Sequence, residues 1–224
     1  MKINATLQKL VVEFLGATLF LIALFGSIGH SLAVPELAIA ATYGLAILIT
    51  QAISGGHLNP IVSLYFYSRK ELSLNLFLLY VLAQVGGAVL GALIGLQLWG
   101  KSVVALSVGN APSPAVLIGE WVATGGLVFI YGFLTSTKRA NLIPFAAAAW
   151  IFSAASFTQS GAQGNPAVSI ALMLNGQGLT VSGWIIIAQV VGLMSGTIGF
   201  MVFTAKPAKA AKSLKAKAKT TTAK

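Results

Sequence analysis

Six apolar runs constrain the fold of this chain more than any other feature. They lie near residues 10–29, 37–54, 74–99, 115–135, 142–157 and 181–204. Each is close to the length of about 20 residues that a helix needs to cross a hydrocarbon core of about 30 Å. Only 8% of the 224 residues are charged, against about 25% in a soluble domain. The sequence therefore predicts an all-α membrane protein with six transmembrane helices.

The basic residues lie almost entirely on one side of these six spans. Pairs of Lys or Arg occur before the first run, between the second and third, and between the fourth and fifth, and seven lysines follow the sixth. Only Lys101 falls in a loop on the other side. The positive-inside rule then places both termini in the cytoplasm. Topology thus accounts for the net charge of +10, and we expect no nucleic-acid partner.

The final segment, 205–224, contains lysines but no acidic residue and no apolar face. We expect a disordered basic cytoplasmic tail that anchors the last span. Binding of this tail to anionic lipid is the alternative.

The chain also repeats itself. "HLNPIVSLYF" from His57 matches "QGNPAVSIAL" from Gln163, and "EFLGATLFLIALFG" from Glu13 matches "EWVATGGLVFIYGF" from Glu120, at offsets of 106 and 107 residues. "LAQVGGAVLG" and "IAQVVGLMSG" form a third pair at an offset of 105. Because the matched positions are polar or glycine, chance similarity between apolar helices is a poor explanation.

The two repeats, about 7–100 and 114–204, each contain three spans within one domain, 1–204. An odd number of spans reverses the direction in which the second half enters the membrane. The predicted architecture is an inverted 3+3 repeat about an axis in the membrane plane.

An Asn-Pro step follows the second span of each half, at Asn59-Pro60 and Asn165-Pro166. Asparagine is a good helix N-cap and proline suits the first helical position. The apolar run after each proline is too short to cross the membrane, so each step predicts a reentrant half-helix. Inversion makes the two half-helices enter from opposite faces and meet at their N-termini. Irregular backbone at that depth is tolerated only where it is buried in protein or lines a water-filled cavity. A cavity is favoured here, because both asparagines can direct an amide into it.

These motifs, together with "SGGHLNPIVSL" and "YVLAQVGGAVLGA", resemble the major intrinsic protein family, the aquaporins and glycerol facilitators, over about residues 10–204. The resemblance implies a pore in each subunit of a homotetramer. It also implies that Glu13 and Glu120 accept hydrogen bonds from the dipping loops and that His57 holds the first loop in shape. A carboxylate within a span needs such a partner in any case. The central constriction would comprise Asn59, Pro60, Ile61, Asn165, Pro166 and Ala167.

The predicted selectivity filter departs from the family pattern. Val168 stands where the second motif usually has arginine, and the fifth-helix position, twelve residues before Asn165, falls on Ser153. Ala162 occupies the filter position in the loop before the second motif. The "YGL" motif lies about one helical turn closer to the first Asn-Pro motif than is usual in the family. The second-span filter position therefore falls on either Tyr43 or Ile39. These residues predict a wide, apolar filter.

The first motif departs as well, because Ile61 replaces the usual alanine. At the crowded midplane this bulkier side chain is expected to shift Asn59 or to narrow the centre of the pore.

We therefore expect a passive channel for water and/or small uncharged solutes such as glycerol, urea, ammonia or metalloid hydroxides. The alternatives are a secondary transporter of a small solute and a non-conducting membrane scaffold. No cofactor or metal is expected. With no cysteine and with His30 and His57 as the only histidines, no nucleophile–base pair points to an enzyme. Membrane lipid surrounds such a protein, and a bacterial inner membrane is the expected location, with a eukaryotic endomembrane as the alternative.

Overall fold

The computed structural model describes residues 4–30 and 33–205, and within these ranges the chain forms helices and no β-strand. Nearly all of the predicted basic tail lies outside the described residues, and its character stays a prediction. Six long apolar helices confirm the six predicted spans within a few residues. They are α1 (Ala5–His30), α2 (Pro35–Ser54), α4 (Leu74–Gln97), α5 (Pro114–Ser136), α6 (Ile143–Phe157, continuing the short helix η1, Ala140–Leu142) and α8 (Leu179–Thr204).

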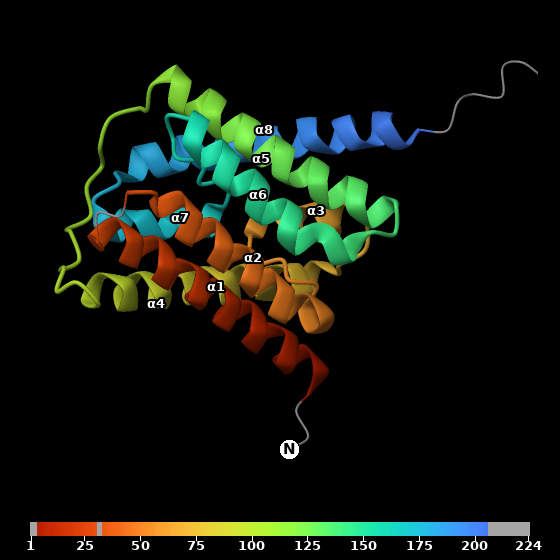
Figure 1. The fold of residues 1–224 in the computed structure, drawn as a ribbon, viewed down its shortest axis with the longest axis horizontal. Helices are drawn as coiled ribbons and strands as arrows, with labels where there is room; N and C mark the ends of the chain where they lie inside the picture. The colour runs from red at the N-terminus through yellow and green to blue at the C-terminus, as the bar shows by residue number, and fades with distance from the viewer. Residues whose placement is uncertain (1–3, 31–32, 206–224) are drawn as a thin grey trace, which may run out of the picture.

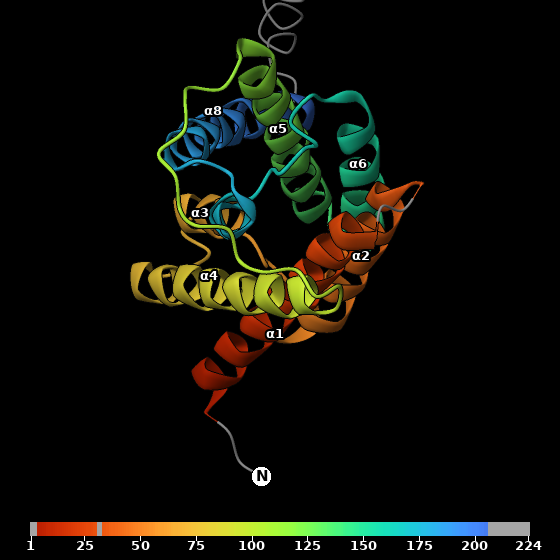
Figure 2. The same ribbon diagram turned by 90° about the vertical axis from the view of Figure 1, so that its left-hand side faces the viewer.

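Two short helices follow the Asn-Pro steps. Helix α3 (Pro60–Ser68) and helix α7 (Pro166–Ala171, continued by η2, Leu172–Asn175) each have proline at the first position. They are too short to cross a bilayer. Figure 2 shows α3 and α7 side by side, surrounded by the six long helices. The structure thus has the predicted reentrant half-helices at its centre.

The two halves of the chain pack in the same way. Helix α1 packs most extensively on α4, and α5 packs on α8. Glycines make both approaches close. A Cβ added at Gly87 or Gly91 would overlap a backbone carbonyl of α1, and one added at Gly192 or Gly196 would overlap a carbonyl of α5. Small residues at every fourth position therefore bring the helices together, as in many membrane proteins.

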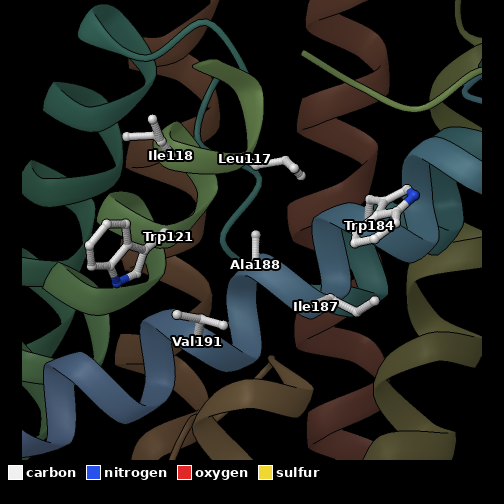
Figure 3. Close-up of a pocket in the computed structure, with 7 residues that line it drawn as sticks. All are labelled: Leu117, Ile118, Trp121, Trp184, Ile187, Ala188 and Val191. Carbon is white, nitrogen blue, oxygen red and sulfur yellow. The ribbon is translucent and has the colours of Figure 1, made fainter. Parts of the chain in front are cut away.

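Helix α1 begins and helix α8 ends at the same end of the bundle, at the right of Figure 1. This agrees with an even number of spans. The outer surface is apolar along the helices. One example is the groove of about 240 Å³ between α5 and α8, which Figure 3 shows with Trp121 on one side and Trp184 on the other. Soluble proteins rarely expose so much apolar side-chain surface, whereas a bilayer accommodates it.

Candidate pore

The two half-helices are capped by asparagine and joined to one another through the same side chains. Asn59 Oδ1 accepts from the backbone N–H of Ile61 at 2.8 Å, and Asn165 Oδ1 accepts from that of Ala167 at 3.0 Å. Asn59 Nδ2 donates to the carbonyl of Gly164 at 2.8 Å, and Asn165 Nδ2 donates to that of Leu58 at 3.0 Å. An amide group has two N–H donors, so each asparagine retains one N–H beyond this bond.

The loops that lead into α3 and α7 share one backbone conformation. Positive φ angles occur at Gly56 (62°) and Leu58 (50°), and again 106 residues later at Ala162 (53°) and Gly164 (56°). Glycine adopts such angles readily and other residues do so at a cost. In the first loop the earlier of these two positions is glycine, and in the second loop the later one is, although the two loops have the same shape. Two loops of the same shape are what bring both carbonyl groups to the junction.

Glu13 of α1 accepts hydrogen bonds from the first loop. Its carboxylate bonds the backbone N–H groups of His57 (2.9 Å) and Leu58 (2.7 Å), the hydroxyl of Ser54 (2.6 Å) and the amide of Gln84 (2.7 Å). The side chain is fully buried. Four donors compensate for burying the carboxylate, and they fix the loop against α1 and α4.

Glu120 of α5 has the corresponding position in the second half. It accepts from the N–H groups of Gln163 (2.8 Å) and Gly164 (2.9 Å) and from the amide of Gln189 (2.8 Å). Each carboxylate therefore accepts hydrogen bonds from the loop of its own half.

Two glutamines complete these clusters, and the sequence interpretation gave them no role. Gln84 Nε2 also donates to Ser63 Oγ at 2.9 Å, and Gln189 Nε2 donates to Ser169 Oγ at 3.1 Å. Each glutamine thereby links the carboxylate of its half to the half-helix. The signal was present in the sequence, because both lie in the repeated "AQV" and the serines lie in "NPIVS" and "NPAVS".

His57 packs within the first loop. Its ring stacks on Phe66 with centroids 4.5 Å apart, lies edge-on to Tyr80, and has Nδ1 3.1 Å from Ser63 Oγ. These contacts connect the first loop to α3 and α4. The corresponding residue of the second half, Gln163, instead donates to Gln177 at 2.8 Å.

A cavity of about 390 Å³ opens at the end of the bundle opposite the termini, and we call it the vestibule. The vestibule contains three of the predicted filter residues, Ile39, Ala162 and Val168. Because a water molecule occupies about 30 Å³ in the liquid, the vestibule has space for several small molecules. Its other lining residues are Phe20, Leu24, Ile28, Pro35, Glu36, Ile151, Ala155, Ser160, Gly161, Gln163, Leu172 and Gln177. Glu36 is thus the one charged residue among the described residues that line it.

The structure corrects the placement of Ser153. This residue is exposed on the outer face of α6, where its hydroxyl bonds the carbonyl of Ala149 at 2.8 Å. Ile151 and Ala155 line the vestibule instead. A shift of two residues turns a helix by about 200°, so Ser153 points away from the cavity that its neighbours face.

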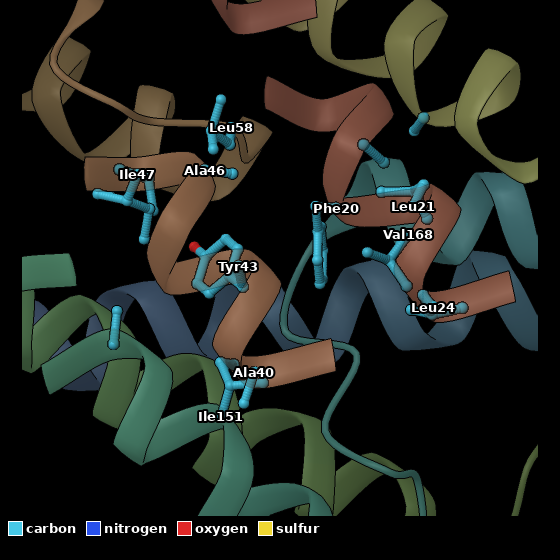
Figure 4. Close-up of a cluster of buried hydrophobic side chains, with 14 of the residues drawn as sticks. Phe20, Leu21, Leu24, Ala40, Tyr43, Ala46, Ile47, Leu58, Ile151 and Val168 are labelled. Atoms are coloured by element: carbon cyan, nitrogen blue, oxygen red, sulfur yellow. The ribbon is translucent and has the colours of Figure 1, made fainter. Parts of the chain in front are cut away.

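Tyr43 and Ile39 do not occupy equivalent places. Ile39 lines the vestibule, whereas Tyr43, one helical turn further along α2, lies below it and is 2% exposed. The Tyr43 ring is 4.9 Å from that of Phe20, and its hydroxyl lies near Asn59 and the hydroxyl of Tyr131. Figure 4 shows Tyr43, Phe20 and Val168 together in this region. Phe20 and Tyr131 were not singled out from the sequence, because within the two repeated stretches they lie at positions where the stretches differ.

Ile61 lies away from this region. It packs in a separate buried cluster with Tyr65, Val128, Leu193 and Phe200, between α3, α5 and α8. Asn59 keeps its cap bond to Ile61, so the larger side chain does not displace it. The expectation that Ile61 narrows the centre is therefore wrong, because the side chain points toward α5 and α8 rather than toward Tyr43. Pro60, Pro166 and Ala167 are buried at the junction.

Solvent does not reach the centre from the vestibule in this conformation. Asn59 has no exposed surface and Asn165 is 3% exposed. The arrangement is a membrane-embedded bundle with an inverted repeat, a largely apolar vestibule and two asparagine-capped half-helices that meet below it. These features define a channel-like membrane protein.

Comparison with known proteins agrees with this class. The family model described as Major intrinsic protein matches residues 1–154. The chain is 31% identical over 175 residues to the aquaglyceroporin AqpS of Rhizobium meliloti, covering 73% of this chain and 74% of that protein. It is 30% identical over 187 residues to a probable TIP-type aquaporin of Medicago truncatula, with the same coverage. The X-ray structure of the aquaglyceroporin from Plasmodium falciparum superposes with a TM-score of 0.64 at 17% identity, covering 88% of this chain and 95% of that one.

The chain belongs to the major intrinsic protein family. It is an integral multi-pass membrane protein that forms a channel for water or small solutes, and it is not an enzyme.

Proposed function

We propose that this protein is a passive channel for water and small uncharged solutes, with glycerol, urea, ammonia and metalloid hydroxides as candidates. The observation that carries the proposal is the reciprocal bonding of Asn59 and Asn165 at the meeting point of α3 and α7. Each asparagine keeps one N–H that a passing oxygen atom can accept from.

The junction favours neutral molecules over ions. A helix N-terminus carries roughly half a positive charge, and two of them face this point, so a cation is repelled. An anion would have to lose its hydration among apolar side chains, which is costly. A neutral molecule avoids both penalties, and passage needs no bound cofactor or energy source.

The vestibule supports solutes larger than water. Val168, Ile39 and Ala162 offer neither a charge nor a side-chain hydrogen-bond donor, so they neither order water nor exclude small organic solutes. Two similar proteins carry the name aquaglyceroporin, which supports glycerol as a candidate.

We further propose that the protein is a homotetramer in a bacterial inner membrane with both termini in the cytoplasm. The apolar outer surface of the helices supports contact with lipid and with neighbouring subunits. The disposition of Lys and Arg around the spans supports the orientation.

A solute panel in proteoliposomes tests the proposal. Vesicles are challenged with inward gradients of glycerol or urea, with and without ionophores that collapse ion gradients, and re-swelling is followed by light scattering. A passive channel gives re-swelling rates that rise linearly with the solute gradient and ignore the ionophores. Accumulation of a solute against its gradient, driven by an imposed ion gradient, would show a secondary transporter instead.

The matched variants are Asn165→Leu and Asn141→Leu. Asn141 is exposed in the short helix before α6, far from the half-helix junction in sequence. Asn165→Leu should lower solute flux, and Asn141→Leu should leave it unchanged. Equal flux through both variants would contradict passage at the junction.

A further inference from the structure

The hydroxyl of Tyr43 is a buried polar group beside Asn59 and Tyr131 that makes no well-aligned hydrogen bond among the described residues. Tyr43 Oη finds no hydrogen-bond partner among the described residues, although it lies near the Tyr131 hydroxyl and the side chain of Asn59. Buried hydroxyl groups are nearly always hydrogen-bonded, so an unpartnered one needs an explanation. Its place beside Asn59 provides one.

Tyr43 stands between the vestibule and Asn59. Phe20 lines the vestibule, the Tyr43 ring contacts Phe20, and the Tyr43 hydroxyl lies near the Tyr131 hydroxyl and Asn59. These contacts run from the vestibule to Asn59, which has no exposed surface, so the Tyr43 ring is among the side chains that separate the two.

The groups around the Tyr43 hydroxyl suit a hydroxyl-bearing molecule. Asn59 has one N–H left after its bond to Gly164. Tyr131 donates its proton to the carbonyl of Gly56 at 3.2 Å, so its oxygen remains an acceptor. Tyr43 itself can donate and accept. A water molecule or the hydroxyl of a small solute both donates and accepts, and it would satisfy the unpartnered group.

Tyr43 and Ile39 lie one helical turn apart on α2. The vestibule position is taken by Ile39, and the aromatic ring is one turn deeper.

We propose that Tyr43 is the specificity-determining residue of the central pore, whose ring restricts passage and whose hydroxyl bonds the permeating water or hydroxylated solute together with Asn59. The inference rests on the proposed channel function. It adds a second selective position, below the vestibule, that depends on one side chain of α2.

The experiment compares Tyr43→Ala and Tyr43→Phe with the wild-type protein in proteoliposomes, by stopped-flow measurement of water and glycerol permeability. Tyr67→Ala and Tyr67→Phe are the matched controls, because Tyr67 is 36% exposed and stacks on Phe77 outside the pore. Tyr43→Leu, which retains an apolar filling, is measured as well in case the alanine variant does not fold. Protein amount and oligomeric state are checked in each preparation.

Tyr43→Ala should raise water permeability by about tenfold, equivalent to about 1.4 kcal/mol in the barrier, with a smaller rise for Tyr43→Leu. Tyr43→Phe should fall below the wild type, because it keeps the ring and loses the hydroxyl. The Tyr67 variants should match the wild type.

A folded Tyr43→Ala protein that is no more permeable than the wild type would overturn the restricting role of the ring. Permeability of Tyr43→Phe equal to or above the wild type would overturn the role of the hydroxyl. If the wild type conducts and the Tyr43→Ala, Tyr43→Leu and Tyr43→Phe variants all equal it, this inference fails alone. If neither the wild type nor any variant exceeds empty vesicles, the channel proposal fails with it.

Discussion

The side-chain amide of Asn59 donates a 2.8 Å hydrogen bond to the carbonyl of Gly164, across the boundary between the two halves of the chain. The bond in the opposite direction runs from Asn165 to the carbonyl of Leu58 at 3.0 Å. Each asparagine thus caps its own half-helix and holds the loop of the other. The residues proposed to contact the solute are also the residues that join the two repeats.

Asn59→Ala should lower the free energy of unfolding by about 2 kcal/mol. The change removes a helix cap, worth about 1 kcal/mol, and a buried hydrogen bond of about 1 kcal/mol. Thermal unfolding in detergent, followed by tryptophan fluorescence, measures it. Asn75→Ala, at an exposed position of α4, is the control and should have little effect. An equal loss for both variants would contradict the structural role of Asn59.

Glu13→Gln should be more damaging than a cap deletion, with a loss of about 3 kcal/mol. The glutamine amide would direct a donor at N–H and O–H groups that now donate to a carboxylate, which leaves buried donors unpaired. Glu71→Gln is the control, because Glu71 is exposed. The measurement is the yield of folded protein together with its unfolding midpoint. A Glu13→Gln protein as stable as Glu71→Gln would show that the loop does not depend on the charge.

The loop conformation predicts opposite effects at two neighbouring positions. Ala162→Gly should raise the free energy of unfolding by about 1 kcal/mol, because alanine is held at a φ of 53°. Gly164→Ala should lower the free energy of unfolding by about the same amount, because it places alanine at a φ of 56°. A steric clash does not contribute, since an added Cβ meets no atom closer than 3.8 Å. Gly183→Ala is the control for a glycine-to-alanine change without backbone strain, because Gly183 lies in α8 and an added Cβ there meets open space. Changes of the same sign at both loop positions, by thermal unfolding, would contradict this account.

Val168→Arg should restrict the vestibule to smaller molecules. The guanidinium would occupy part of the cavity and supply donors that bind water, so the ratio of glycerol to water permeability should fall about tenfold, as for other size-selective pockets. Val168→Leu, which changes size only slightly and adds no charge, should keep the ratio near that of the wild type. Proteoliposome re-swelling provides both permeabilities. An unchanged ratio in the arginine variant would place the selective point elsewhere.

Most of the fold could be predicted because its signals are repeated. Glu13 and Glu120, like Asn59 and Asn165, recur at nearly one offset, and this recurrence together with the odd number of spans per half predicts the inversion. The Asn-Pro steps predict half-helices because the cap chemistry and the short apolar run are local properties. The roles of Gln84 and Gln189 could have been inferred in the same way, since they occupy matched places in the third repeated stretch.

The filter was harder to predict because it depends on helix phase and loop length. Counting twelve residues back from Asn165 crosses a loop, where an error of two residues is easily made. Such an error selects Ser153 in place of Ile151 or Ala155, and Ser153 lies on the opposite face of α6. The depth of Tyr43 depends on the phase of α2, in which Ile39, one turn earlier, lines the vestibule. Ile61 was placed wrongly because its direction depends on packing against Val128 and Phe200, which no local pattern encodes.

The most direct test of the central claim is stopped-flow light scattering on proteoliposomes of the wild-type protein, challenged with an impermeant osmolyte and then with glycerol, at several temperatures. The account predicts volume changes faster than in empty vesicles for at least one of the two challenges, with weak temperature dependence and no response to ionophores. Rates equal to those of empty vesicles for both challenges, from folded protein, would contradict it.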